Sequence, residues 1–230
     1  MHTQPSFRIR ASITTGWNLF TKHLEILIEL YLLYFLIAVA GGLVTAAVQD
    51  NVLAYVLISM LRIVFTWFLM IGIMKAGLKI RAGERATIRD LFSGKDKLLN
   101  VILVYILLGL ILTAVVVVPV ILAVIAGVAL HLTAVVVILA TLALCALVYV
   151  SARLTQSVFI IIDTSLSPVA ALKRSWKITK GSFWRLLGFL LLLCVINFGG
   201  LIALIIGLLV TIPFTMMCQI VVYKKLAENA

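Results

Sequence analysis

Apolar positions in this chain come in long unbroken runs, which short polar segments separate. The runs cover residues 24–48, 52–74, 98–126, 132–152 and 183–223. About 20 consecutive apolar residues form a helix that crosses the hydrocarbon core of a bilayer, and the last run holds two such helices if it turns near Gly207. The pattern therefore predicts about six transmembrane helices. We place them at residues 24–48, 52–74, 98–126, 132–162, 183–206 and 210–226.

The fold class follows from the continuity of these runs. Strands of a transmembrane barrel alternate apolar and polar residues, a pattern that continuous runs exclude. Composition agrees, because 64% of the 230 residues are hydrophobic, 12% are charged and the mean hydropathy is +1.26. A soluble domain is about half apolar and a quarter charged. The sequence thus predicts an all-α, polytopic integral membrane protein, with residues 1–230 forming a single membrane domain.

The boundaries of the two middle spans are open to two interpretations. Residues 98–162 form a stretch longer than two minimal spans require. Either both helices are long and tilted, or residues 154–162 lie along the membrane interface. Pro119, Gly127 and His131 are the positions where we expect this stretch to kink or break.

Positive charge alternates along the chain from one loop to the next. The formal net charge is +11, and Lys and Arg gather at both ends of the chain, in 75–97 and in 173–185. The turns near Asp50, Gly127 and Gly207 hold none. Because short loops rich in Lys and Arg stay in the cytoplasm, we expect both termini there. We expect no nucleic-acid partner, since no soluble domain presents the charge.

The segment SPVAALKRSWKITKGSFWR, residues 167–185, has the pattern of a basic amphipathic helix. Ser167 suits the N-cap and Pro168 the first turn, and Gly181 ends the helix. The predicted apolar face holds Val169, Leu172, Trp176, Thr179 and Phe183. The basic residues are Lys173, Arg174, Lys177, Lys180 and Arg185. Such a helix lies in the lipid headgroup layer, where each Lys or Arg contributes about 1 kcal/mol of attraction to anionic lipid.

Three segments share a polar–apolar helical pattern that leads into an apolar run. They are ITTGWNLFTKHLEILIEL (13–30), TIRDLFSGKDKLLNVILV (87–104) and ALKRSWKITKGSFWRLLG (171–188). Thr87 and Asp90 form a capping-box-like start in the second segment. We interpret the chain as three units of one interfacial helix and two spans. The units cover residues 6–80, 86–163 and 167–228. The alternative is that basic loops before spans resemble one another without repetition.

Aromatic residues mark the same interface. In the first unit, helical spacing predicts an apolar stripe of Ile9, Ile13, Trp17 and Phe20. We expect Trp17, Trp176 and Trp184 at the cytoplasmic surface of the bilayer, where an aromatic belt is their ordinary explanation.

Polar residues inside the predicted spans are the candidates for function, because a bilayer tolerates few of them. They are Glu25, Glu29, Arg62, Arg153 and Asn197. One hypothesis makes Arg62 or Arg153 bind an anionic headgroup or substrate, with Glu29 as counter-charge. The alternatives are a structural ion pair or an arginine that snorkels to the interface. Arg62 and Glu29 are expected to differ in depth by about 12 Å at 1.5 Å per residue.

No sequence motif of an enzyme is present. The chain has no HExxH, GxSxG, Walker or GxGxxG motif, and its histidines lack the spacing of metal ligands. We therefore expect no catalytic residue, no metal and no cofactor. The alternative of an intramembrane enzyme acting on lipid phosphates requires several polar groups that converge at one depth.

A family resemblance rests on three stretches of the sequence. FIIID (159–163) with the following SPVAALKRSWKITKGSFWRLL resembles a motif of poorly characterised bacterial multi-pass membrane proteins, which are related to the membrane domain of glycerophosphoryl diester phosphodiesterase. TGWNLFTKH (15–23) and IGLLVTIPF (206–214) resemble the same group. The resemblance covers the ends of the chain and little of its middle. It implies a protein of the bacterial cytoplasmic membrane with about six helices, and no phosphodiesterase activity, which belongs to a separate soluble domain.

The expected function is that of a non-enzymatic membrane protein. It would bind anionic lipid, or a membrane protein partner or second copy, through its basic interfacial helices. The alternative is a small transporter or channel with an intramembrane polar site around Arg62, whose path Glu29, Arg153 and Asn197 would also line.

Overall fold

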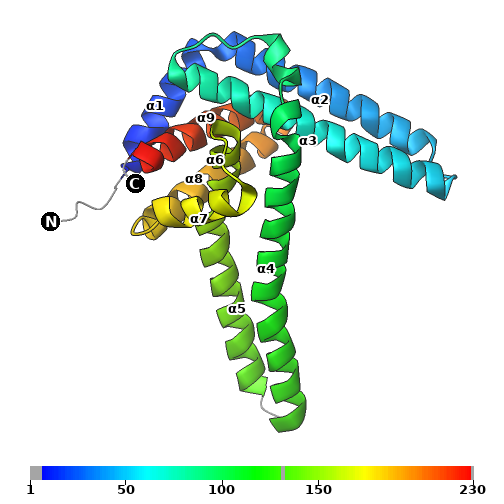
Figure 1. Cartoon of the computed structure of the whole chain (residues 1–230), viewed down its shortest axis with the longest axis vertical. Coiled ribbons are helices and arrows are strands. Elements are labelled where there is room, and N and C mark those ends of the chain that lie inside the picture. Colours follow the sequence, from blue (N-terminus) through cyan, green and yellow to red (C-terminus); the bar gives the residue numbers. More distant parts are fainter. Residues whose placement is uncertain (1–6, 131–132, 229–230) are drawn as a thin grey trace. The chain divides into compact units, whose positions relative to one another are not determined.

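The computed structural model describes residues 7–130 and 133–228, and these residues contain helices and no strand (Figure 1). The membrane-length helices are α2 (Leu24–Ala47), α3 (Val52–Ala82), α4 (Lys95–Leu130), α5 (Thr133–Leu154), α8 (Phe183–Ile202) and α9 (Leu204–Glu228). The shorter elements are α1 (Ile9–Lys22), the 3₁₀ helix η1 (Ile88–Phe92), α6 (Ser157–Asp163) and α7 (Pro168–Ile178).

Among the described residues, six helical segments are long and apolar enough to cross a membrane. They are Leu24–Ala47, Val52–Ala82, Lys95–Ile125, Ala134–Asp163, Phe183–Ile202 and Gly207–Glu228. The prediction of an all-α polytopic membrane protein with about six spans is confirmed. The third and fourth segments are long, but their length does not decide between the two interpretations of residues 98–162, since residues 157–163 form a helix of their own.

The fourth span is interrupted close to its polar end. Helix α5 ends at Leu154, a turn follows at Thr155 and Gln156, and α6 then continues to Asp163. The break expected at Pro119 does not occur, because α4 stays helical through this residue. Membrane helices tolerate an internal proline where neighbouring groups satisfy the freed backbone. His131 lies outside the described residues.

The turn between the last two spans lies at Ala203, so the prediction of a turn near Gly207 is wrong. The glycines here allow close helix contact instead. A Cβ on Gly207 would lie 2.2 Å from the carbonyl oxygen of Gly200. A Cβ on Gly200 would lie 2.3 Å from Oγ1 of Thr211. Without side chains at these two positions, α8 and α9 approach each other directly after a one-residue connection.

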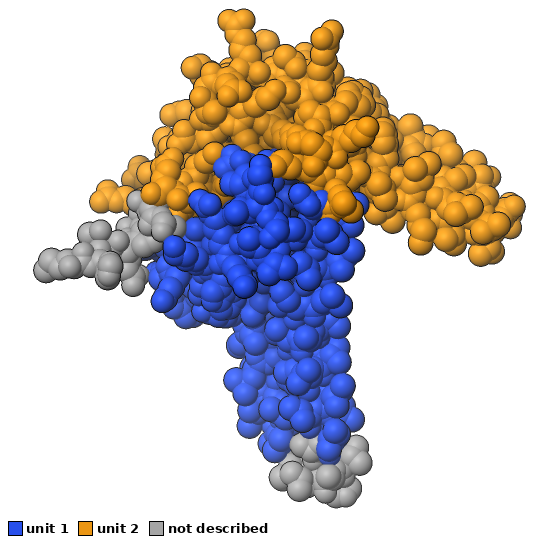
Figure 2. Space-filling model, in the orientation of Figure 1, with its two compact units in different colours: residues 1–5, 100–188, 230 blue, residues 6–99, 189–229 orange. Residues whose placement is uncertain are grey.

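The described residues fall into two compact units (Figure 2). Unit 1 contains residues 100–130 and 133–188, and unit 2 contains residues 7–99 and 189–228. The predicted single membrane domain and three-unit repeat stay predictions, because compactness and sequence repetition are different properties.

Helix α9 is the central element of unit 2. It packs against α1, α2 and α3, and α2 and α3 form an antiparallel hairpin. The half of α9 that includes Met217, Ile220 and Tyr223 is buried. The 3₁₀ helix η1 packs on α3, where a Cβ on Gly72 would lie 2.1 Å from the carbonyl oxygen of Leu91. Gly72 therefore sets how closely the loop after α3 can fold back.

Helix α1 buries only part of the face that its apolar stripe predicts. Ser12, Gly16 and Phe20 are buried, whereas Trp17 is 48% exposed. A Cβ on Gly16 would lie 2.9 Å from Cα of Cys218, so the glycine brings the backbones of α1 and α9 together. Close backbone approach selects the small-residue face and leaves part of the apolar stripe on the outside.

Candidate functional site

Helix α7 begins as its sequence predicts. Ser167 is the N-cap and accepts a hydrogen bond from the N–H of Ala170, and Pro168 opens the first turn. The helix ends at Ile178, and Gly181 adopts a φ of 78° in the turn that follows. Glycine adopts this left-handed conformation without steric cost, so it sets the abrupt change of direction into α8.

The predicted apolar face of α7 is only partly correct. The structure buries Ala171, Leu172, Ser175, Ile178 and Thr179. Val169 and Trp176, which were expected on the same face as Leu172, are exposed. The buried face differs from the predicted one because Arg153 of α5 forms hydrogen bonds with Ser175 and Thr179 on this side of α7.

Arg153 fastens the end of α5 to the end of α7 within unit 1. Its Nε donates a hydrogen bond to Oγ1 of Thr179 and its Nη1 to the hydroxyl of Tyr149, both at 2.8 Å. Its Nη2 donates to the carbonyl oxygen of Trp176. In return, Oγ of Ser175 donates to the carbonyl oxygen of Arg153 at 2.8 Å.

The guanidinium of Arg153 is stabilised by dipoles and aromatic rings. It is 4% exposed, and among the described residues it forms no ion pair. The carbonyl it binds lies in the last turn of α7, where the helix dipole favours a cation. Its Cζ also lies 4.3 Å from the ring centroid of Trp176, in the range of a cation–π contact. Arg153, a predicted intramembrane polar candidate, thus has its donors engaged by the protein itself.

The outer face of α7 and the segment after it carry exposed cations, which we call the α7 basic cluster. The cluster consists of Lys173, Arg174, Lys177, Lys180 and Arg185. None of the five is in an ion pair within the part of the chain that the structure describes. Lys173, Arg174 and Lys177 line a hollow of about 420 Å³. Trp184 beside the cluster is 80% exposed, so uncompensated positive charge and an aromatic side chain share this surface.

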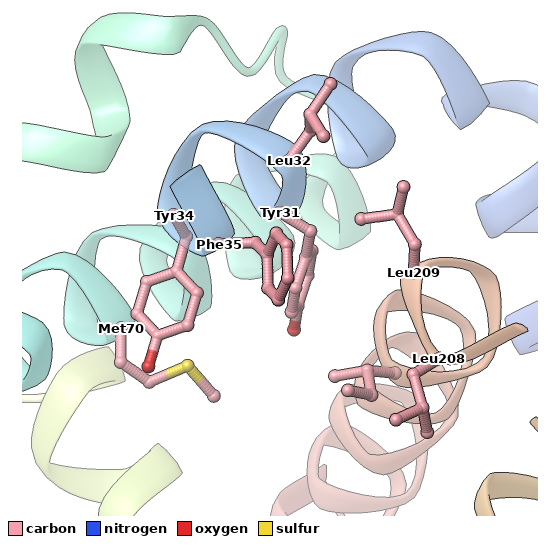
Figure 3. A pocket seen from close by; sticks show the side chains of 8 residues that line it. Tyr31, Leu32, Tyr34, Phe35, Met70, Leu208 and Leu209 are labelled. Carbon is pink, nitrogen blue, oxygen red and sulfur yellow. The ribbon is translucent and has the colours of Figure 1, made fainter. Parts of the chain in front are cut away.

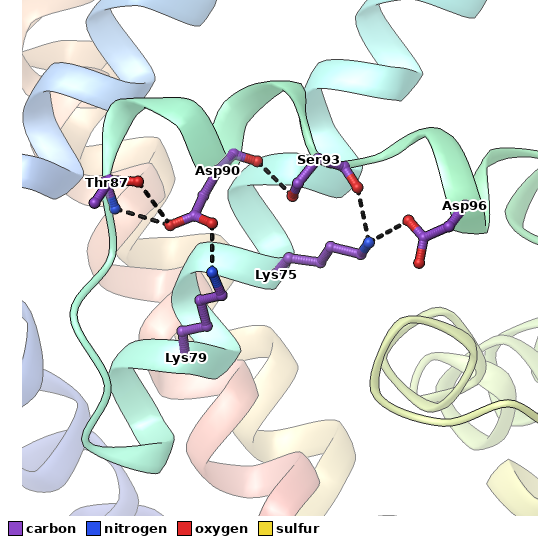
Figure 4. A network of polar contacts seen from close by, with 6 residues as sticks. All are labelled: Lys75, Lys79, Thr87, Asp90, Ser93 and Asp96. Atoms are coloured by element: carbon purple, nitrogen blue, oxygen red, sulfur yellow. Dashed lines mark hydrogen bonds and ion pairs between the residues drawn. The ribbon is translucent and has the colours of Figure 1, made fainter.

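A second polar network joins α3 to the loop before α4 in unit 2 (Figure 4). Lys79 pairs with Asp90 at 2.5 Å, and Lys75 pairs with Asp96 and donates to the carbonyl oxygen of Ser93. The predicted capping box is confirmed, because the N–H of Thr87 donates to the Asp90 carboxylate at 2.8 Å. The lysines were counted as loop charge in the sequence. Lys75 and Lys79 are four residues apart, about one helical turn, and this spacing could have predicted that both face the same partner segment.

The carboxyl of Asp90 has a pKa below its ordinary value. Burial raises this pKa, but the hydrogen bond and positive charge of Lys79 and the hydrogen bonds from Thr87 outweigh that effect. The carboxylate is therefore ionised at neutral pH. It holds η1 on α3 by charge-assisted hydrogen bonds.

Arg62 and Glu29 do not form an ion pair, which was one of the alternatives considered for them. Arg62 lies opposite Gly41 of α2, where a Cβ would be 3.2 Å from Cδ of the arginine. Glu29 is twelve residues from Gly41 on the same helix, which is about 18 Å at 1.5 Å per residue. Glu29 is exposed, as is Glu25 at the start of α2. The depth difference of about 12 Å expected from the sequence was too small because it ignored how the hairpin pairs.

Asn197 has a partner within unit 2. Its side-chain amide donates to Oγ1 of Thr215 at 3.2 Å, which links α8 to α9. Interhelical hydrogen bonds of this kind stabilise membrane bundles by about 0.6–2 kcal/mol. The geometry gives Asn197 a packing role between these helices.

An apolar pocket of about 490 Å³ lies between α2, α3 and α9 (Figure 3). Tyr34, Phe35, Met70 and Leu208 are among the residues that line it. The volume is in the range of small-molecule sites, about 300–1,000 Å³. Its walls come from membrane-spanning segments, so a hydrocarbon chain of the bilayer fits its chemistry better than a polar substrate does.

Within the described residues, no three His, Cys, Asp or Glu side chains gather in a way that could hold a metal ion. Comparison of the chain with protein-family models, with curated proteins and with solved structures returns no match. The arrangement of the described residues therefore carries the functional argument.

Proposed function

We propose that this chain is a non-enzymatic integral protein of the bacterial cytoplasmic membrane that binds anionic lipid headgroups through the α7 basic cluster. The observation that carries the proposal is the exposure of all five cations of the cluster, without ion-pair partners among the described residues. A cation that is neither paired nor buried retains its full attraction for a phosphate group. The proposal places both termini in the cytoplasm, because basic loops face that side.

The anchoring of α7 supports this role. Arg153, Ser175 and Thr179 bind the inner face of the helix to α5, so α7 cannot rotate to bury its lysines or release them into solution. The cations are held on a fixed surface with the exposed ring of Trp184. Tryptophan prefers the level of the headgroups, and the cluster beside it meets lipid phosphates at that level.

The expected gain in affinity for anionic headgroups determines how the experiment is designed. Each basic residue near an anionic surface contributes about 1 kcal/mol, so four of them raise affinity for an anionic headgroup by at most about a thousandfold. Salt reduces this value because the Debye length is about 8 Å at physiological ionic strength. The preference for anionic over zwitterionic lipid should therefore fall as salt rises.

The test compares two variants that lose the same charge. In one, Lys173, Arg174, Lys177 and Lys180 are all changed to Gln. In the control, four exposed cations outside α7 are changed to Gln, namely Lys22, Arg85, Arg89 and Lys95. The full chain is placed in nanodiscs of phosphatidylglycerol and phosphatidylcholine, and the lipids that stay bound are counted by native mass spectrometry. The α7 variant should lose the preference for phosphatidylglycerol, and the control should keep most of it. Equal loss in both variants would reduce the effect to net charge and refute the proposal.

The geometry gives less support to a transporter or channel. Among the described residues of unit 2, Asn197 bonds to Thr215, and Arg62 lies at the level of Gly41 rather than of Glu29. A polar path needs polar groups that follow one another through the bilayer. The relationship to the membrane domain of glycerophosphoryl diester phosphodiesterase stays part of the proposal and rests on residues 15–23, 159–187 and 206–214.

A further inference from the structure

Arg62 is a charged side chain in the middle of a span. It follows Val52, the first residue of α3, by ten positions, which is about 15 Å at 1.5 Å per residue. Its Nε is buried and has no hydrogen-bond partner among the described residues. Oγ of Ser59, one turn earlier on the same helix, is also buried without a partner. Two unsatisfied polar groups therefore lie on one side of α3 where the medium is hydrocarbon.

The stem of the Arg62 side chain lies against α2. Its Cγ and Cδ lie 3.3 and 3.2 Å from where a Cβ on Gly41 would be. The absent side chain of Gly41 thus makes room for the arginine stem.

The chain offers no counter-charge at this depth. Residues 98–162 and 183–227 contain no Asp or Glu. In the α2–α3 hairpin, Glu29 lies twelve residues from Gly41 and Asp50 lies twelve residues from Arg62, each about 18 Å away along a helix. An ionisable residue inside a membrane faces a partner or a polar cavity almost without exception. The partner of Arg62 must therefore come from outside the chain.

The surface next to Arg62 suits a helix. A Cβ on Gly42, the residue after the arginine's neighbour Gly41, would meet no atom within 4 Å, so here the backbone of α2 is open to close approach, as small residues at membrane helix interfaces require. Between Leu32 and Phe68 the structure buries only Thr45, which leaves apolar side chains on either side of the charge. A small residue, apolar side chains and a cation thus lie at a similar depth in the bilayer.

We propose that the α2–α3 surface around Gly42 and Arg62 is a docking site for a transmembrane helix of another protein that carries a carboxylate near the middle of the bilayer. The carboxylate accepts hydrogen bonds from Nη1 and Nη2 of Arg62, because Nε and Oγ of Ser59 are buried within the chain and out of reach of a docked helix. Charge complementarity selects this occupant. A second copy of the chain would bring no acidic residue to this depth, and a lipid phosphate lies about 15 Å away at the headgroups.

The test uses the full chain in phosphatidylcholine bilayers with a labelled leucine–alanine peptide long enough to span them. The peptide carries one central residue, either Glu, Gln or Leu, and its association is measured by energy transfer to a dye on the C-terminus of the chain. The wild type should bind the Glu peptide about tenfold more tightly than the Leu peptide, in the range of interhelical polar contacts. Arg62→Gln should abolish that preference. Arg62→Glu should reject the Glu peptide and bind a peptide with a central Arg.

Arg62→Lys keeps the charge and should keep part of the preference for the Glu peptide. It is the control that separates loss of charge from misfolding in the other variants. Equal binding of the Glu and Leu peptides to the wild type would overturn the proposal. Two further results would also overturn it. One is self-association of the wild type that Arg62→Gln removes. The other is an Arg62-dependent effect that appears only when phosphatidylglycerol is added. The α7 basic cluster is unchanged in all these variants, so their outcome is independent of the lipid-binding proposal.

Discussion

Replacing Asp90 by asparagine tests whether the network of Figure 4 holds the loop after α3 in place. The Asp90 side chain is 8% exposed and accepts hydrogen bonds from Lys79 at 2.5 Å and from the N–H of Thr87 at 2.8 Å. Asp96 is the matched control, because it also pairs with a lysine of α3 but is 59% exposed. The same substitution therefore removes one shielded and one solvated ion pair.

The expected costs differ because solvent screens only one of the pairs. A hydrogen bond to a charged group contributes about 1.5–3 kcal/mol. The introduced asparagine can still accept from the Thr87 N–H, so Asp90→Asn should cost about 2–3 kcal/mol of local stability. Asp96→Asn should cost about 0–1 kcal/mol, as exposed ion pairs do. Hydrogen exchange of the amides of residue 90 and Ser93, whose backbone hydrogen bonds close η1, should accelerate roughly 30- to 140-fold in the first variant.

The pH dependence follows from the lowered pKa of Asp90. A carboxyl whose pKa is lower in the folded state contributes stability that is fully present above its unfolded value, about 3.9. This contribution is lost as the pH falls through the folded value. After correction for intrinsic exchange rates, the extra protection of η1 in the wild type should begin to fall below about pH 4, and protection should reach that of Asp90→Asn only below the lowered pKa of Asp90. If Asp90→Asn and Asp96→Asn exchange alike at pH 7, or if the extra protection of the wild type does not decline at all below about pH 4, the network does not stabilise the loop.

Two further predictions concern packing. Gly72→Ala places a methyl group 2.1 Å from the carbonyl oxygen of Leu91 and should cost about 1–3 kcal/mol of stability in detergent unfolding, whereas Gly42→Ala meets open space and should change it by less than about 1 kcal/mol. Arg153→Lys should destabilise more than Arg153→Met, because a buried ammonium cannot reach all three acceptors while the methionine removes the charge; the reverse order in an unfolding titration would contradict this account.

The sequence was sufficient to predict the spans, because hydrocarbon imposes a length and composition that few other constraints modify. The cap at Ser167 and the capping box at Thr87 were also predictable, since they depend on residues at most three apart. The expectation that Arg62 could pair with Glu29 was wrong for the opposite reason. It depended on which residue of α2 faces which residue of α3, and Gly41 determined that register through a contact with no hydrophobic signal.

The predicted buried faces of α1 and α7 were partly wrong for the same reason. Tyr149 is one turn before Arg153, but the other partners of Arg153 lie up to 26 residues away, and nothing in the local pattern connects Ser175 or Thr179 with it. Hydrophobic periodicity assigns a helix face by the apolar character of its residues, but a neighbouring backbone can approach only over small ones. The two criteria disagree wherever a glycine or serine stands next to a large apolar residue.

The packing of helices through small residues also affects the proposed contact with lipid, because it leaves two tryptophans partly exposed. In α1 the buried Gly16 precedes Trp17, and in α7 the buried Ser175 precedes Trp176. In both helices the small residue packs inward, and the neighbouring indole is partly exposed, by 48% and 40%. An inward tryptophan would strengthen the core at the expense of the interface. One side of the Trp176 ring contacts the guanidinium of Arg153, and the Trp17 ring contacts Phe214. The exposed remainder of each ring can meet the headgroup layer, which tryptophan prefers. The small residues that defeated the face prediction are therefore the ones that make both tryptophans available to the membrane.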